Sequence, residues 1–309
     1  MKWTLVCLLI GASAAQTTFR TDVRLVNLAV TVKDGAGRLV DDLSQNDFEV
    51  AEDGVPQKIA LFARSSGVPL NLGLVIDISG SQAEFMRTHQ RDLRAFLEKT
   101  LGERDRAFLE CFAADPRLVV DYTSSSRQLV KGLEGYIATP DKRPYPLLGR
   151  SVQRRRYGGT AFYDAIYDAA NQMFQKVERG RKALIVFSDA EDNDSVHDIE
   201  QTIEMAQSNE VLIFAIGYFE TVRGVWDSRH QYGRSVMERI ARETGGADFD
   251  ASQQDVSSHF TEIGEQLRSS YEIAYHSSNP PADRTFHKVA VRVKRPGLVA
   301  RAKTGYYAK

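Results

Sequence analysis

The residues with the clearest chemistry are Asp77, Ser79 and Ser81, which end and follow a short apolar run. Such a run is typical of a buried strand in an α/β sheet. Because these sheets bind ligands at the carboxyl ends of their strands, we expect the three side-chain oxygens to converge in one turn at the rim. Hard oxygen ligands suit a divalent cation, and Mg²⁺ in particular, which keeps several waters and takes few protein ligands.

Two later stretches have the same character. Thr160 follows two glycines and precedes a long helical pattern, and Asp189 ends a second apolar run that begins at Ala183. In this order and context the five positions resemble the metal-ion-dependent adhesion site (MIDAS) of von Willebrand factor A domains. The predicted metal ligands are Asp77, Ser79, Ser81, Thr160 and Asp189.

The resemblance implies a role for each ligand. The hydroxyls of Ser79, Ser81 and Thr160 would touch the cation, and the two carboxylates would act directly or through water. We therefore expect Mg²⁺, with Mn²⁺ or Ca²⁺ as alternatives, and a protein or peptide partner whose exposed carboxylate completes the coordination. The chain departs from the common pattern at Gln82, where Met is usual, and at Ala190, where Gly is frequent; neither position supplies a ligand.

A basic segment, residues 141–157, leads directly into the glycines before Thr160. It has one acid, Asp141, and two prolines. Its cations would lie at the metal rim, where they would steer an acidic partner toward the cation or simply remain solvated. The residues proposed for steering are Lys142, Arg143, Arg150, Arg154, Arg155 and Arg156.

Enzymatic functions fit the sequence less well than a binding function does. A phosphatase of the haloacid dehalogenase type also uses an aspartate at a strand end as a nucleophile, but it needs a second aspartate where this chain has Ser79. The sequence has no Gly-x-Ser-x-Gly elbow and no Gly-Lys-Ser/Thr phosphate loop. We therefore expect a protein that is not an enzyme. A scaffold that binds through other faces of the domain is the main alternative, and a metal-dependent phosphohydrolase is a more distant one.

The composition is that of a soluble globular chain, and the N-terminal segment predicts export. Of the 309 residues, 42% are hydrophobic and 26% charged, and the net charge of -1 gives no reason to expect nucleic acid as a partner. Residues 1–15 have a positive start, an apolar middle and small residues before a cleavage site, which is typical of a signal peptide. No other apolar run is long enough to span a bilayer. We expect a secreted or periplasmic protein with no integral membrane span.

Strand and helix patterns divide the remaining chain into three parts. Residues 17–66 and 270–309 show the two-residue alternation of β-strands, whereas residues 67–269 alternate strands with helices. The alternation predicts a mainly parallel sheet covered on both faces, a Rossmann-like α/β fold that agrees with the family resemblance. We expect this domain to be inserted in, or flanked by, a small all-β sandwich-like domain formed by the two β segments.

Local patterns in the β segments carry two further expectations. The strand-like residues Phe48–Val50 and Ile59–Leu61 flank Asp53-Gly54, which predicts a hairpin between them. Three short segments, residues 30–35, 47–54 and 304–306, resemble segments of a group of bacterial, notably acidobacterial, proteins related to von Willebrand factor A. This resemblance rests on the similarity of the residues themselves and not on a physical argument.

Overall fold

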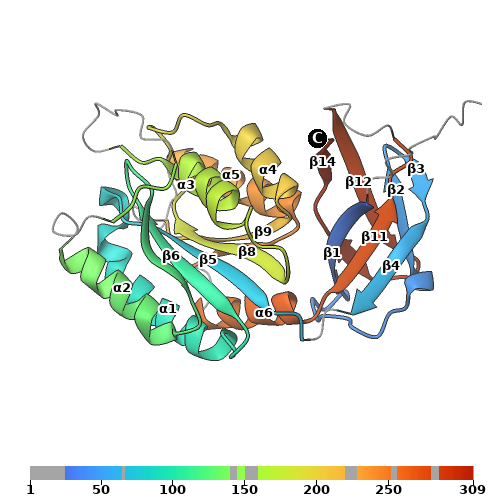
Figure 1. Ribbon diagram of the computed structural model, residues 1–309, viewed down its shortest axis with the longest axis horizontal. Helices are drawn as coiled ribbons and strands as arrows, with labels where there is room; N and C mark the ends of the chain where they lie inside the picture. The colour runs from blue at the N-terminus through green and yellow to red at the C-terminus, as the bar shows by residue number, and fades with distance from the viewer. Residues whose placement is uncertain are drawn as a thin grey trace, which may run out of the picture.

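A computed structural model describes residues 25–64, 67–139, 145–149, 159–219, 228–251, 256–279 and 285–308. It places an α/β unit beside a two-sheet β sandwich (Figure 1). This arrangement confirms the predicted fold class. No helix in the described part of the chain combines the length and the apolar character needed to cross a membrane.

The α/β unit is built on a six-stranded sheet. Its strand order is β10-β9-β8-β5-β6-β7, and all neighbours are parallel except β6 and β7. Every residue of β5, β9 and most of β8 is buried, because helices cover both faces of the sheet. The strands are β5 (Leu70–Asp77), β6 (Arg106–Phe112), β7 (Arg117–Thr123), β8 (Arg181–Ser188), β9 (Val211–Gly217) and β10 (Asp248–Asp250).

Helices cover both faces of this sheet (Figure 1). Leu93, Phe96 and Phe260 belong to the apolar core on one face, and Ile166, Ile203 and Ile240 to the core on the other. The first face carries α1 (Met86–Thr100), α2 (Ser126–Ala138) and α6 (Val256–Arg268), and the second carries α3 (Phe162–Asp168), α4 (Ile199–Ser208) and α5 (Ser228–Thr244).

Two helices depart locally from a regular amphipathic α-helix. The helical pattern over residues 161–177 becomes α3 followed by a π-helical turn, Ala169–Met173. The helix α5 is described from Ser228, and its buried apolar side chains begin at Val236. Its first two turns are mostly polar and partly exposed, so hydrophobic spacing gives no signal for them.

The sandwich joins strands from both ends of the described chain. Strand β1 pairs with β11, and β2 pairs with β12, both antiparallel. Leu28, Tyr275, Val50 and Val293 contribute to the apolar core that the two sheets share. The sheets have the order β13-β1-β11-β4 and β14-β12-β2-β3. The strands are β1 (Leu25–Lys33), β2 (Phe48–Glu52), β3 (Val55–Gln57), β4 (Ile59–Arg64), β11 (Tyr271–His276), β12 (Phe286–Val293), β13 (Val299–Arg301) and β14 (Gly305–Tyr307).

The predicted hairpin is wrong in one of its strands. Asp53-Gly54 does form a tight turn, with both residues at positive φ, but the turn connects β2 to the short strand β3. The apolar residues from Ile59 onward form β4, which pairs with β11 in the other sheet. The strand β3 is exposed and contains Pro56, which suits an edge position, so it lacks the apolar alternation that would have revealed it.

One of the contacts between the two units lies where α6 passes into the sandwich. Only Ser269 and Ser270 separate the end of α6 from β11. The buried guanidinium of Arg181, at the start of β8, donates from Nη1 to the carbonyl oxygen of Leu267 at 2.7 Å and forms an ion pair with Glu272 in β11. This side chain therefore connects the sheet, α6 and the sandwich at the edge of the sheet opposite the candidate site.

Candidate metal centre

Asp77 is the last residue of β5 and is fully buried. Its Oδ1 accepts a hydrogen bond from the backbone N–H of Ser79 at 2.9 Å, and its Oδ2 accepts one from the Ser188 hydroxyl at 2.6 Å. The next residue, Ile78, donates its N–H to the carbonyl oxygen of Phe112 at the end of β6. These contacts hold the carboxylate at the carboxyl edge of the sheet.

The two serines lie together directly after Asp77. The Oγ atoms of Ser79 and Ser81 are 3.2 Å apart, within hydrogen-bond distance. Ser79 precedes the 3₁₀ turn Gly80–Phe85, whose first turn is closed by a 3.0 Å hydrogen bond from the Gln82 N–H to the Ser79 carbonyl oxygen. The tight turn brings the two hydroxyls to one side of the chain, as the sequence predicts.

Asp189 directly follows β8, the neighbour of β5 in the sheet, and is buried. Its Oδ1 accepts from the Glu191 N–H at 3.0 Å, and its Oδ2 accepts from the Gln82 amide at 2.9 Å. Ala190 has a φ of +56°, in the left-handed region that glycine adopts more readily. This conformation explains why a glycine is favourable at this position and turns the following loop back over the site.

Thr160 reaches the same edge from the start of α3. Its N–H donates to the Oδ1 of Asn193 at 2.8 Å, and its carbonyl oxygen accepts from the N–H groups of Asn193 and Asp194. A β-carbon on Gly159 would lie 2.6 Å from the β-carbon of Asp194, so only glycine fits before Thr160. Hydrogen bonds and close packing therefore join the loop after Asp189 to the loop before α3.

The electrostatics of the site fit a bound cation. Burial, and to a smaller extent the charge of Asp189, raises the pKa of Asp77 to about 7, although hydrogen bonds from Ser188 and Ser79 oppose the rise. Within the described part of the chain no lysine or arginine side chain pairs with Asp77 or Asp189. Buried carboxylates are costly without a positive partner. Two such carboxylates, with the hydroxyls of Ser79, Ser81 and Thr160 on loops at the same edge of the sheet, are a donor set that suits a hard divalent cation.

The proposed steering residues cannot be placed at the site. Lys142, Arg143, Arg150, Arg154, Arg155 and Arg156 all lie outside the described residues, as does the signal peptide. The described part of this segment, residues 145–149, lies along β7: Leu118 donates its N–H to the Pro146 carbonyl oxygen, and Leu148 donates to that of Pro116.

Three residues at the site were not predicted as contributors. Ser188 donates a hydrogen bond to the carboxylate of Asp77, and Gln82 donates one to that of Asp189. Asn193 accepts a hydrogen bond from the N–H of Thr160. Ser188 has a signal in the sequence, because it is a polar residue that directly precedes Asp189 at the end of an apolar run. Gln82 and Asn193 have none, because their partners are distant in the chain.

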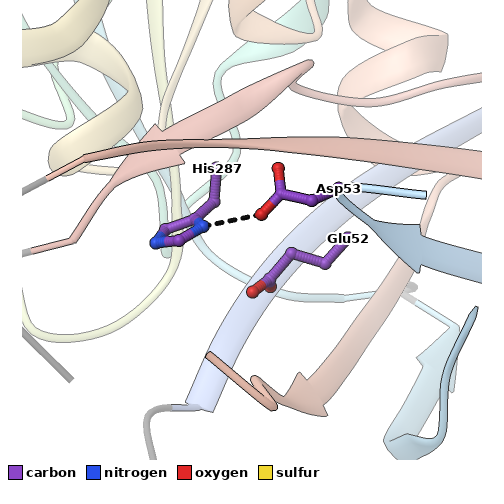
Figure 2. Close-up of side chains that lie close together, drawn as sticks. All are labelled: Glu52, Asp53 and His287. Atoms are coloured by element: carbon purple, nitrogen blue, oxygen red, sulfur yellow. Dashed lines mark hydrogen bonds and ion pairs between the residues drawn. The ribbon is translucent and has the colours of Figure 1, made fainter. Parts of the chain in front are cut away.

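A second group of metal-ligand side chains lies in the sandwich. Candidate ligand atoms of Glu52, Asp53 and His287 lie within 4.8 Å of one another (Figure 2). The carboxylate of Glu52 is fully buried and accepts hydrogen bonds from four neutral donors. These are Tyr275 Oη at 2.5 Å, Ser277 Oγ at 2.5 Å, Asn279 Nδ2 at 2.6 Å and Tyr306 Oη at 3.1 Å.

This second group is best described as a structural network. The two hydrogen bonds on each oxygen of Glu52 satisfy the carboxylate without a cation. Asp53 accepts at Oδ2 from His287 Nδ1 at 2.8 Å, and this hydrogen bond lowers the pKa of Asp53 (Figure 2). The network ties β2 to the end of β11 and to β12 and β14, so it stabilises the sandwich.

Comparison with known families agrees with the fold. The sequence model of the von Willebrand factor type A domain matches residues 148–265, which include Thr160 and Asp189, while Asp77, Ser79 and Ser81 precede the matched stretch. Over this stretch the chain matches the family model of the von Willebrand factor type A domain. No match was found among curated proteins.

Several solved structures are similar in fold. Proximal thread matrix protein 1 from the mussel byssus has a TM-score of 0.50 at 16% identity, over 70% of this chain and 51% of that one. Another structure of that mussel protein is described as having a zinc-occupied MIDAS motif, with a TM-score of 0.48 at 15% identity, over 70% of this chain and 50% of that one.

Two bacterial structures are also similar. A von Willebrand factor type A protein from Catenulispora acidiphila has a TM-score of 0.49 at 12% identity, over 94% of this chain and 75% of that one. An aerotolerance-related membrane protein from Bacteroides fragilis has a TM-score of 0.47 at 17% identity, over 64% of this chain and 98% of that one. At these identities the likeness concerns the fold alone.

Proposed function

We propose that this protein binds a protein or peptide partner through a divalent cation, and that it is not an enzyme. The cation, Mg²⁺ in the first instance, would be held by Asp77, Ser79, Ser81, Thr160 and Asp189. An exposed carboxylate of the partner would complete the coordination. The protein would act after export, in the periplasm or outside the cell.

One observation supports this proposal above the others. Asp77 and Asp189 are buried at the ends of adjacent strands, and among the described residues no cationic side chain pairs with either carboxylate. A divalent cation would balance the charges of both carboxylates, and its remaining coordination positions toward solvent could accept an anionic oxygen of a partner.

The same geometry argues against nucleophilic catalysis by Asp77. A carboxylate nucleophile must reach its substrate, yet Asp77 is fully buried and both oxygens accept hydrogen bonds from Ser79 and Ser188. Ser79 occupies the position at which a phosphatase of the haloacid dehalogenase type would have its second aspartate.

The proposal is tested with labelled peptides that contain a single aspartate or glutamate. Fluorescence anisotropy would measure their binding to the protein with Mg²⁺ and with a chelator. We expect binding that requires the cation and that is lost when the acidic residue is replaced by its amide. Binding that is unchanged by the chelator and by the amide would contradict the proposal and favour a scaffold that uses other faces of the domain.

A further inference from the structure

Gln82 is a fully buried side chain beside the candidate ligands. Its Nε2 donates to Oδ2 of Asp189 at 2.9 Å and to the carbonyl oxygen of Tyr218 at 3.2 Å. Its Oε1 has no hydrogen-bond partner among the described residues. A buried amide with an unpaired oxygen is costly. The unpaired oxygen therefore reduces the stability that the two amide hydrogen bonds contribute.

The contacts of Gln82 connect three loops at the carboxyl edge of the sheet. The residue itself lies in the 3₁₀ turn that follows Ser81, Asp189 follows β8, and Tyr218 follows β9. The other oxygen of Asp189 accepts from the Glu191 N–H. Asp189 is thus held at both oxygens, and Gln82 is the side chain that determines where Oδ2 lies relative to the two serines.

We propose that Gln82 positions Asp189 for the cation and makes the site selective for Mg²⁺ over Ca²⁺. This inference rests on the proposed metal site. Mg²⁺ requires nearly ideal octahedral geometry with short bonds, whereas Ca²⁺ accepts six to eight ligands in flexible arrangements at longer distances. A carboxylate that is fixed by hydrogen bonds therefore favours Mg²⁺, and a carboxylate that is free to rotate loses that preference. Gln82 touches the ligand and not the cation, so its role is one of positioning.

Gln82→Met is the variant that tests this role. Methionine is unbranched and close to glutamine in length, so it fills the space while removing the amide donor from Asp189. Replacement of a residue that orients a metal ligand typically lowers metal affinity by about 10- to 100-fold. We expect a fall of that size for Mg²⁺ and a smaller one for Ca²⁺, so that the ratio of the two affinities decreases.

Gln207 provides a matched control. It is also buried, its Nε2 donates to a backbone carbonyl oxygen, that of Glu243, at 2.8 Å, and its Oε1 likewise has no partner among the described residues. It lies at the end of α4, just before β9 starts, at the edge of the sheet opposite the candidate site. Gln207→Met should change the stability of the fold as Gln82→Met does, without changing either metal affinity.

The experiment is a calorimetric titration with Mg²⁺ and, separately, with Ca²⁺. It compares the full mature protein with its Gln82→Met and Gln207→Met variants. Circular dichroism would confirm that each variant is folded. Gln82→Asn, which keeps an amide but is too short to reach Asp189, serves as the second variant and should show the same reduced preference. A lower Mg²⁺-to-Ca²⁺ affinity ratio in the two Gln82 variants, with the parent ratio in Gln207→Met, would support the inference.

Two other results would overturn the inference, and they can be told apart. If the parent binds Mg²⁺ and the Gln82 variants keep its affinity ratio, the metal site stands and the role of Gln82 is refuted. If the parent binds neither cation, the proposed metal site itself fails, and the role of Gln82 fails with it.

Discussion

The hydroxyl of Ser188 donates a 2.6 Å hydrogen bond to Oδ2 of Asp77 and joins the ends of the adjacent strands β8 and β5. The same oxygen of Ser188 accepts from the N–H of Ala190. One serine therefore orients a candidate metal ligand and anchors the loop that carries Glu191. The adjacent strands of the sheet thus place the ligand and the group that orients it side by side.

Ser188→Ala should weaken Mg²⁺ binding about tenfold, because it removes a hydrogen bond that orients the carboxylate of Asp77. Calorimetric titration would measure the change. Ser277→Ala is the matched control, since Ser277 also donates to a buried carboxylate, that of Glu52, but does so in the sandwich. An equal loss of Mg²⁺ affinity in both variants would show that the effect comes from general destabilisation.

Glu110 predicts a pH dependence of stability. It lies in β6, is fully buried, and neither carboxylate oxygen has a hydrogen-bond partner among the described residues. Burial, with a contribution from the charge of Asp168, raises the pKa of Glu110 well above its usual value of 4.5. The unfolded chain ionises near that usual value while the folded chain stays protonated. The contribution of Glu110 to stability is therefore complete below pH 4.5 and is lost as the pH rises toward the folded-state pKa.

Glu110→Met should consequently raise the free energy of unfolding by about 1–3 kcal/mol at pH 8, and by less at pH 5. Urea denaturation at both pH values would measure the difference. Glu110→Gln is the control, because it removes the titration but keeps a buried polar group; it should flatten the pH dependence with a smaller gain. A gain from Glu110→Met that is equal at both pH values would refute the assignment of a raised pKa.

The buried network around Glu52 makes a prediction about the sandwich. Tyr275→Phe removes the 2.5 Å hydrogen bond to Oε2 of Glu52 and should cost about 1.5–3 kcal/mol, the range for a hydrogen bond to a charged group. Tyr307→Phe is the control, because its hydroxyl has no hydrogen-bond partner among the described residues; it should change stability by less than about 0.5 kcal/mol. Equal effects in urea denaturation would mean that Glu52 does not depend on this donor.

Much of the fold is predictable because its signals are local. The apolar run that ends at Asp77 and the one that begins at Ala183 became β5 and β8, which lie side by side in a mainly parallel sheet. That pairing explains why residues 77 and 189, which are far apart in the chain, are found at the same edge. The convergence of Ser79 and Ser81 follows from their spacing in one turn.

The parts that could not be predicted depend on distant partners. Gln82 gains its role from Asp189 and Tyr218, which come more than a hundred residues later, so nothing near it in the sequence marks it. The edge strand β3 could not be predicted, because its residues around Pro56 do not alternate between buried apolar and exposed polar side chains. The binding of a cation by the five ligands, and the steering role of the basic segment, remain predictions for experiment.

Calorimetric titration of residues 17–309 with Mg²⁺, alongside Asp77→Ala and Thr160→Ala, tests the metal site most directly. The two substitutions remove a buried carboxylate at the end of β5 and a hydroxyl at the start of α3, so they probe the site from two separate loops. We predict saturable binding in the parent that is lost in both variants, while circular dichroism shows that their folds survive. Absence of Mg²⁺ binding in the parent, or unchanged binding in both folded variants, would contradict the account.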